Sequence, residues 1–167
     1  MIRLARLAAP LALFGALGGC GLQPMYAGGG SGAVAQGLAA VEVAPIEGQA
    51  GWLVRNALRD RLAQSGNTAE PRYRLDVLLD DELEGLGLLT DETVGRERRT
   101  LRARYQLVDL VSGSIVVDAT AGSDAGIDVV SSEFATIAAE QTALENLAVE
   151  VADRIVTRLT LTLRAQS

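Results

Sequence analysis

The sequence predicts an α+β fold, a two-layer sandwich with two helices packed on one face of a four-stranded, mostly antiparallel sheet. Four segments alternate apolar and polar residues, fully or in part, as half-buried strands do. Two others repeat apolar residues every three or four positions, as amphipathic helices do. The order is strand, helix, three strands, helix. Each element has one apolar side, and a two-layer packing buries all of these sides together.

The first strand and the first helix follow each other directly. Residues 38–46 alternate in part and end near Pro45, which lacks the N–H that a sheet ladder needs. Residues 52–64 have apolar residues at helical spacing, and Gly66 and Asn67 beyond them are typical of a helix end. The apolar positions of this helix are Val54, Ala57, Leu58 and Leu62.

The next three strands are expected at about residues 72–89, 97–111 and 114–121, as an antiparallel meander. In the first two, alternate positions are apolar, and arginines and other polar residues occupy the positions between them. Ser112 and Gly113 form a tight-turn signal between the last two strands. The alternating apolar positions are Tyr73, Leu75, Val77 and Leu79, then Leu101, Ala103, Tyr105 and Leu107.

A long helix is expected to close the chain. Residues 122–131 predict a polar loop, after which Ser131 or Ser132 caps the helix. Glu133 at its start suits the helix dipole, and the helical pattern continues to about residue 160. The apolar stripe consists of Phe134, Ile137, Ala138, Leu144, Leu147, Ala148, Val151, Ile155, Leu159 and Leu163.

The N-terminus reads as a secretory signal peptide over residues 1–19. Its apolar stretch of eleven residues, Leu7 to Leu17, is too short for a membrane-spanning helix, which needs about 20. The four residues that end at Cys20 resemble the lipobox of bacterial lipoproteins. This resemblance implies a diacylglycerol and an N-acyl chain on Cys20. It also favours the outer membrane, because Gly21 replaces the aspartate that retains enteric lipoproteins at the inner membrane. The alternative is an ordinary signal peptide with an incidental cysteine.

The mature chain then divides into a lipidated, glycine-rich tether over residues 20–37 and one α+β domain over residues 38–167. Residues 21–37 contain six glycines, and a flexible coil of that length spans on the order of 23 Å. The lipid can therefore lie in a membrane leaflet while the domain stands away from it.

Composition argues against catalysis and against nucleic-acid binding. The chain has neither histidine nor lysine, and its single cysteine is assigned to the lipid. The mature chain has 13 arginines and 21 acidic residues, a net charge of −8, which disfavours nucleic acid. Histidine-based triads and imidazole metal sites are excluded. We therefore expect a binding or structural protein without cofactor, metal or catalytic residue. An envelope hydrolase that uses carboxylates is the remaining enzymatic alternative.

The segment between Asp80 and Arg104 is the candidate functional region, because acids fill its first half and arginines its second. It is expected to fold back as a hairpin with its tip at residues 90–95. One reading is cross-strand ion pairing, which contributes little stability at a surface. The other is an arginine row that binds anionic groups, since arginine binds phosphate bidentately. The candidate anion-binding residues are Arg96, Arg98, Arg99, Arg102 and Arg104.

Three further features of the sequence predict local environments. The acids from Asp80 to Glu84 lack the spacing of a calcium loop, so a solvated strand end is expected there. Trp52 at a helix start is expected to pack in the core or as a hydrophobic staple. Tyr26 in the tether is a candidate for packing against the domain or a partner.

Four segments of the chain match a known family pattern. They are Cys20-Gly21-Leu22-Gln23-Pro24-Met25-Tyr26, Arg55-Asn56-Ala57-Leu58-Arg59-Asp60-Arg61-Leu62, Tyr73-Arg74-Leu75 and Ala103-Arg104-Tyr105-Gln106-Leu107. With these segments the chain resembles the LPS-assembly lipoprotein family LptE, especially its alphaproteobacterial branch. Its order of elements matches that family over nearly the whole mature chain, although the glycines after Tyr26 depart from the pattern.

The resemblance implies partners. Proteins of that family lie as a plug inside the outer-membrane β-barrel LptD, assist insertion of lipopolysaccharide into the outer leaflet, and bind lipopolysaccharide. The anion-binding candidates Arg96, Arg98, Arg99, Arg102 and Arg104 would then be the lipopolysaccharide-binding residues. The alternative is another non-catalytic cell-envelope lipoprotein, such as the auxiliary lipoprotein of an ABC-type lipid transporter. The two differ in the partner that would co-purify, which is an outer-membrane barrel in the first case and an inner-membrane permease complex in the second.

Overall fold

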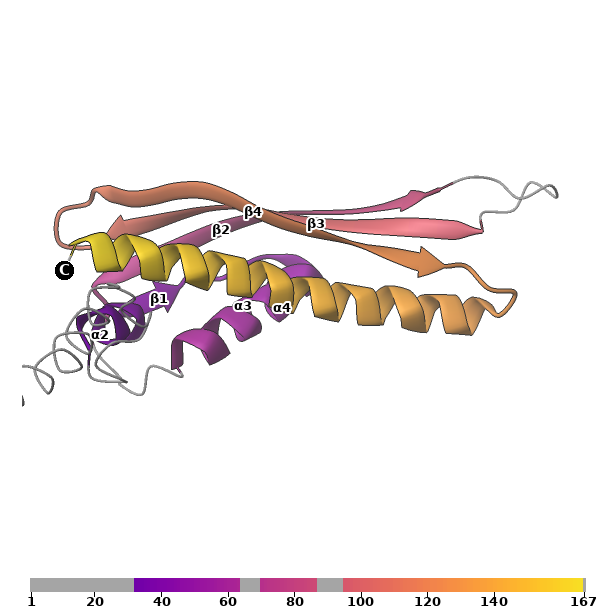
Figure 1. The fold of residues 1–167 in the computed structure, drawn as a ribbon, viewed down its shortest axis with the longest axis horizontal. Helices are drawn as coiled ribbons and strands as arrows, with labels where there is room; N and C mark the ends of the chain where they lie inside the picture. The colour runs from indigo at the N-terminus through magenta and orange to yellow at the C-terminus, as the bar shows by residue number, and fades with distance from the viewer. Residues whose placement is uncertain (1–31, 64–69, 87–94, 167) are drawn as a thin grey trace, which may run out of the picture.

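The computed structural model describes residues 32–63, 70–86 and 95–166, which form three helices on one face of a four-stranded sheet (Figure 1). The predicted α+β class and the two-layer packing are confirmed, with a third, short helix added. The elements are α2 (Ala33–Ala39), β1 (Val41–Val43), α3 (Gly48–Ala63), β2 (Tyr73–Gly85), β3 (Arg96–Asp109), β4 (Ile115–Asp128) and α4 (Glu133–Gln166).

The strands lie in the order β1-β2-β3-β4. The short β1 pairs in parallel with β2, and α3 forms the crossover between them. β2, β3 and β4 form the predicted antiparallel meander with long, continuous pairing. Opposite Arg102 on β3, for example, lie Asp80 on β2 and Gly122 on β4. This register decides which charged residues become neighbours.

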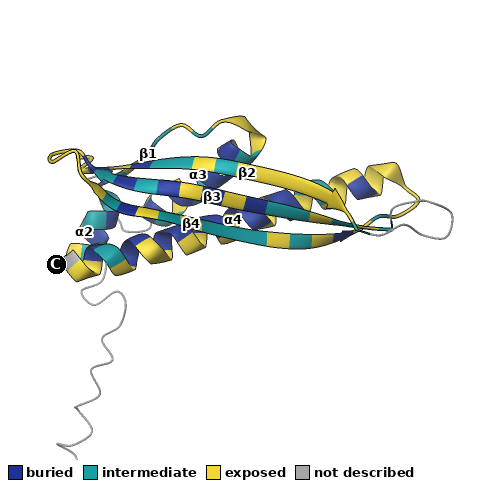
Figure 2. Cartoon of the chain, turned by 90° about the horizontal axis from the view of Figure 1, so that it is seen from above, coloured by how far each residue is buried: buried dark blue, intermediate teal, exposed yellow. Residues whose placement is uncertain are grey.

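Alternation gives the sheet two different faces. On β3 the odd-numbered residues from Leu101 to Asp109 are buried beneath the helices, and the even-numbered residues between them are exposed or half-buried (Figure 2). We call these sides the helix-covered face and the open face. The fully buried large side chains are Leu38, Val54, Leu58, Leu75, Leu101, Tyr105, Leu107, Leu144, Leu147, Val151, Ile155 and Leu159.

The helix layer is built around α4, a 34-residue helix about 51 Å long at 1.5 Å per residue. Ser132 precedes it and caps it, because the Ala135 N–H lies 3.4 Å from the Ser132 hydroxyl and 3.0 Å from its carbonyl. α3 packs beside α4 in the same direction. Gln49 donates to Gln141 at 2.8 Å near the start of α3. The C-terminal helix α4 continues beyond the expected residue 160, to Gln166.

The Asp109–Ser114 turn confirms the tight-turn prediction. Gly113 has φ +69°, a left-handed conformation that favours glycine. The Asp109 carboxylate accepts the N–H groups of Val111 at 2.8 Å and Ser112 at 3.0 Å. These hydrogen bonds hold the Asp109 pKa below its ordinary value, with Ser112 the larger cause. The turn fixes the start of β4 against the end of β3.

Two expected segments differ in the structure. The tether was expected to run to residue 37, but residues 33–39 form α2, whose Leu38 is buried in the core. Residues 122–131 were expected as a loop, but β4 continues to Asp128, because pairing with β3 overrides a composition rich in glycine and aspartate. The expected hairpin tip lies mostly outside the described residues.

Two expectations about apolar side chains were wrong. Trp52 is 64% exposed on α3, so it neither packs in the core nor acts as a staple. Phe134 and Ile137 begin the apolar stripe of α4, yet they are 83% and 54% exposed. Ala138 is exposed as well, and the rest of the stripe, from Leu144 to Leu163, is buried as predicted. Within the described ranges, no helix is long and apolar enough to cross a membrane.

Candidate functional site: the arginine row on the open face

The structure divides the five candidate arginines between the two faces of the sheet. Because side chains alternate along β3, four of them lie on the open face, and Arg99 lies on the helix-covered face. We call the open-face set the arginine row. Its members are Arg96, Arg98, Arg102 and Arg104.

The contacts of Arg99 lie within the fold and join three of its elements. Its guanidinium pairs bidentately with Asp81 on β2, with Nε–Oδ1 at 2.9 Å and Nη2–Oδ2 at 2.7 Å. Nη1 also donates to the backbone carbonyl of Glu140 on α4 at 3.2 Å. The Asp81 hydrogen bonds raise the Arg99 pKa. With its donors used inside the fold, Arg99 is separate from the arginine row.

Three members of the arginine row pair with aspartates on β4. The distances are 3.2 Å for Arg96–Asp128, 3.9 Å for Arg98–Asp124 and 3.2 Å for Arg104–Asp118. The sequence had instead indicated the acids of the β2–β3 hairpin as the ion-pair partners. On the open face of β2 these acids are Asp80, Glu82 and Glu84, and none forms an ion pair with the described arginines. Ion pairing therefore accounts for part of the arginine row, with partners that the sequence did not identify.

Asp118 illustrates how these pairs are held. Its carboxylate accepts Nε2 of Gln106 at 3.0 Å and Nη2 of Arg104 at 3.2 Å. The Gln106 hydrogen bond and then the Arg104 hydrogen bond lower the Asp118 pKa. Asp118 thus stays ionised and offsets much of the positive charge of Arg104.

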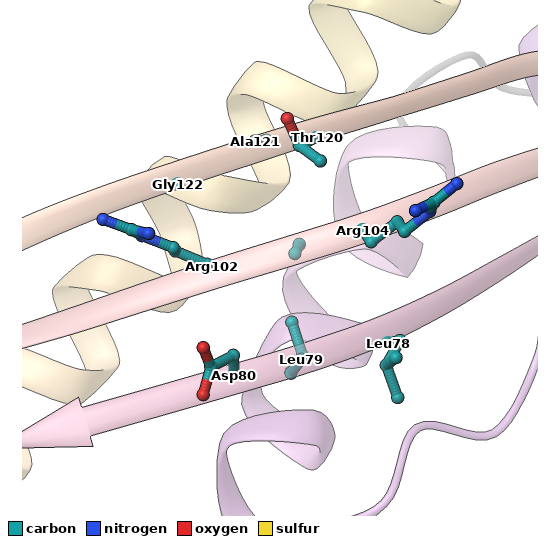
Figure 3. A pocket seen from close by; sticks show the side chains of 9 residues that line it. Leu78, Leu79, Asp80, Arg102, Arg104, Thr120, Ala121 and Gly122 are labelled. Carbon is teal, nitrogen blue, oxygen red and sulfur yellow. The ribbon is translucent and has the colours of Figure 1, made fainter.

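Arg102 differs from the other three. Among the described residues its guanidinium has no ion pair and no hydrogen bond, although Asp80 lies opposite it on β2. On its other side is Gly122, where a Cβ atom would lie 3.2 Å from Arg102 Cγ. The stem of Arg102 therefore runs close over a glycine backbone (Figure 3). No local pattern around Gly122 predicted this role, because only the strand register brings the two residues together.

Arg102 borders an open hollow of about 460 Å³ on the sheet surface. Figure 3 shows Arg102 and Arg104 pointing away from one another, with Leu78, Thr120 and Gly122 around the space between them. Leu78 is 74% exposed, which is unusual for a leucine on a face of charged residues. A guanidinium without an ion pair beside apolar surface suits a ligand that has both an anionic group and hydrocarbon, and the Asp80 carboxylate lines the same hollow.

The other residues that the sequence singled out add no metal site among the described residues. In the described part of the chain, no group of three or more acidic, cysteine or histidine side chains is placed to hold a metal. The expected lipidation site Cys20, the tether residue Tyr26 and the acids Asp91 and Glu92 lie outside the described residues.

Several solved structures that share this fold are described as bacterial lipoproteins. A protein of Caulobacter crescentus classed as a lipoprotein is 26% identical, with a TM-score of 0.65 over 81% of this chain and 98% of that one. A minor lipoprotein of Acinetobacter baumannii (13% identical, TM-score 0.59, 72% of this chain and 90% of that one) has the same fold. So does rare lipoprotein B of Shewanella oneidensis (15%, 0.51, 73% and 94%). No curated protein sequence matches the chain.

The α+β fold of this chain is therefore the one that these bacterial lipoproteins share. Residues 38–159 match the model of the lipopolysaccharide-assembly family LptE. Since the match spans most of the chain, the protein belongs to the LptE family, and the resemblance noted in the sequence is confirmed at that level.

Proposed function

We propose that this chain is an outer-membrane lipoprotein of the alphaproteobacterial LptE type. It is anchored through diacylglycerol and N-acyl chains on Cys20, and it assists lipopolysaccharide insertion as the plug partner of the LptD barrel. Membership of the lipopolysaccharide-assembly family supports the process, and the identity to the Caulobacter protein supports the type. The lumen of an outer-membrane barrel is polar, which suits a domain with a charged, solvent-facing sheet.

We further propose that the open face binds lipopolysaccharide at Arg102. The observation that carries this is the position of Arg102, which has no ion pair or hydrogen bond among the described residues and lies beside Leu78 and the hollow. A lipid phosphate would pair with the guanidinium, and acyl or sugar carbons would cover Leu78. Arg96, Arg98 and Arg104 contribute a positive field that their aspartates partly cancel. Arg99 is no longer part of this proposed site.

Lipopolysaccharide binding to the purified, lipidated protein tests the site. Arg102→Ala should weaken binding about ten-fold or more, since a hydrogen bond to a charged group contributes about 1.5–3 kcal/mol. Arg59→Ala, at an exposed position on α3, is the matched control and should leave the affinity unchanged. A dephosphorylated lipopolysaccharide should bind the wild type and Arg102→Ala equally weakly. Equal affinity of wild type and Arg102→Ala for intact lipopolysaccharide would contradict the site.

The partner is tested separately, by purifying the native lipidated chain from membranes and identifying by mass what accompanies it. A large outer-membrane barrel in stoichiometric amount is the expected result. An inner-membrane permease complex would instead favour an auxiliary lipoprotein of an ABC-type transporter. Either result is independent of the Arg102 measurement, so the two proposals can fail separately.

A further inference from the structure

β4 is a long strand at the edge of the sheet, with one side unpaired. The Val129 N–H donates to the Gly95 carbonyl at 3.2 Å, one step beyond the Arg96–Asp128 pair. In an antiparallel ladder the bonded pairs alternate, so odd-numbered residues of β4 bond to β3. The even-numbered residues direct their N–H and C=O groups away from the sheet. They are Asp118, Thr120, Gly122, Asp124, Gly126 and Asp128.

Only one of these outward groups has a partner among the described residues. Arg154 on α4 donates from Nη1 to the Gly122 carbonyl, and its Nη2 lies 3.3 Å from the Ser123 hydroxyl. The other outward N–H and C=O groups between Asp118 and Gly126 have no hydrogen bond within the described parts of the chain. This stretch therefore offers a row of unpaired backbone donors and acceptors.

β4 lacks most of the devices that protect such edges. Protective edge strands are short, or carry lysine, proline or a mid-strand bulge. β4 has 14 residues without lysine or proline, and its register shift lies at the turn end, opposite Leu107 and Val108. Its charged residues are three aspartates, and each of them pairs with an arginine of β3. Residues 119–123 are small, so they leave room for another strand to approach. Arg154 covers a single carbonyl.

A hollow lies beside this edge on the helix side. Its volume is about 600 Å³, and it is lined by residues 119–122 of β4 with Tyr105, Arg154 and Arg158. Tyr105 is only 2% exposed as a residue. Among the described residues its hydroxyl has no hydrogen-bond partner and is not fully buried, so it can be reached from the hollow. The Arg158 guanidinium likewise has no ion pair or hydrogen bond there. A guanidinium and a phenol hydroxyl without protein partners in one hollow suit a carboxylate.

The edge and the hollow fit one kind of ligand. A strand added to β4 would lie roughly 4.8 Å away, and alternate side chains would point to the helix side. One of those side chains would enter the hollow beside α4. An aspartate or glutamate there would pair with Arg158 and accept a hydrogen bond from the Tyr105 hydroxyl. The backbone would supply affinity and the hollow would supply selectivity.

We propose that the outer edge of β4, at residues 118–124, docks an extended segment of a partner protein by strand addition, with an acidic side chain of that segment in the Arg158 hollow. The proposal goes beyond lipid binding on the open face and does not depend on it. A second copy of this chain is the weaker occupant, because pairing two β4 edges would bring Asp118 and Asp124 of one copy close to those of the other.

Photo-crosslinking in cells tests the docking geometry. A benzoylphenylalanine is placed in the full chain at 118, 120 or 124, one position at a time, and the cross-linked residue of the partner is mapped by mass spectrometry. Strand pairing predicts one contiguous partner segment. Moving the probe by two residues along β4 should move the cross-linked residue by two, and an aspartate or glutamate should lie within that segment.

Two substitutions, each made with the probe at 118, test the two halves of the site. Thr120→Pro removes an outward N–H that β3 does not use, and Arg158→Glu reverses the charge in the hollow. Each should lower the cross-linking yield at least five-fold. Thr120→Val keeps the N–H, and Arg59→Glu changes an exposed arginine on α3, so both controls should leave the yield unchanged. Circular dichroism verifies that each variant is folded.

Four outcomes would overturn the proposal. They are no cross-link at any of the three positions, contacts without the two-residue register, cross-linking only to a second copy of this chain, or full yield with Arg158→Glu. The Arg158 variant keeps the test decisive if Thr120→Pro fails to fold, because an exposed arginine on a helix tolerates substitution.

Discussion

Arg99 and Asp81 form a bidentate ion pair on the helix-covered face, with contacts of 2.9 and 2.7 Å. The two side chains are 17% and 25% exposed. Arg99 also donates to the Glu140 carbonyl, so a single guanidinium connects β2, β3 and α4. This pair is the most enclosed of the ion pairs between described residues.

Breaking this pair should destabilise the fold. We expect Arg99→Ala and Asp81→Ala each to lower the free energy of unfolding by about 1.5–3 kcal/mol, because each leaves a half-buried charge without its partner. The double variant should cost less than the sum of the two. Arg98→Ala is the control, since its 3.9 Å pair is half exposed and should contribute under about 0.5 kcal/mol. Urea unfolding measures all four variants, and strictly additive effects would contradict the coupling.

Gly51 should not tolerate a side chain. It is buried in the first turns of α3, and a Cβ atom there would lie 2.7 Å from the backbone carbonyl of Ile46. Gly51→Ala should lower the thermal midpoint and cost more than about 2 kcal/mol, since backbone must move to relieve the overlap. Gly126→Ala is the matched control, because nothing lies within 4 Å of its Cβ position. Equal midpoints for the two variants would argue against this packing.

The Asp109 turn should make stability depend on acid pH. The carboxylate has a lowered pKa in the folded protein, so its contribution is complete above the ordinary aspartate pKa and is lost as pH falls through the folded-state value. Asp109→Ala should therefore be less stable than wild type at pH 7, and the gap should shrink below about pH 4. Urea midpoints of both proteins at pH 7, 5 and 3 provide the measurement. A gap that does not change with pH would exclude this role for the carboxylate.

Cys20→Ala tests the proposed anchor. The buried core extends from Ala35 to Leu163, so the substitution should leave the thermal midpoint unchanged. Loss of the lipid should move the protein from membranes to the soluble periplasmic fraction. Thermal unfolding measures the midpoint. Cell fractionation with and without the barrel measures the release from membranes. Retention only when the barrel is present would favour the plug role, whereas unchanged retention without the barrel would contradict the lipid anchor.

The layers, faces and turns could be predicted because they depend on local patterns. Alternation in β2 and β3 fixed which side of each strand is apolar, and this set the helix-covered face. Gly113 marked the turn, since few other residues adopt its conformation. The stripe of α4 from Leu144 onward is likewise a local periodicity. These signals extend over only a few neighbouring residues, which is why a single sequence carries them.

The ion pairs between strands and the exposure of individual side chains could not be predicted in the same way. The sequence showed arginines after acids, but the register decided that Arg99 meets Asp81, that Arg104 meets Asp118, and that Arg102 runs over Gly122. Exposure of Trp52 also depends on which elements come near it. The sequence by itself determined the order of elements and their apolar sides. Only the tertiary structure decided which charges are compensated, because ion pairing depends on distances between strands that are far apart in the chain.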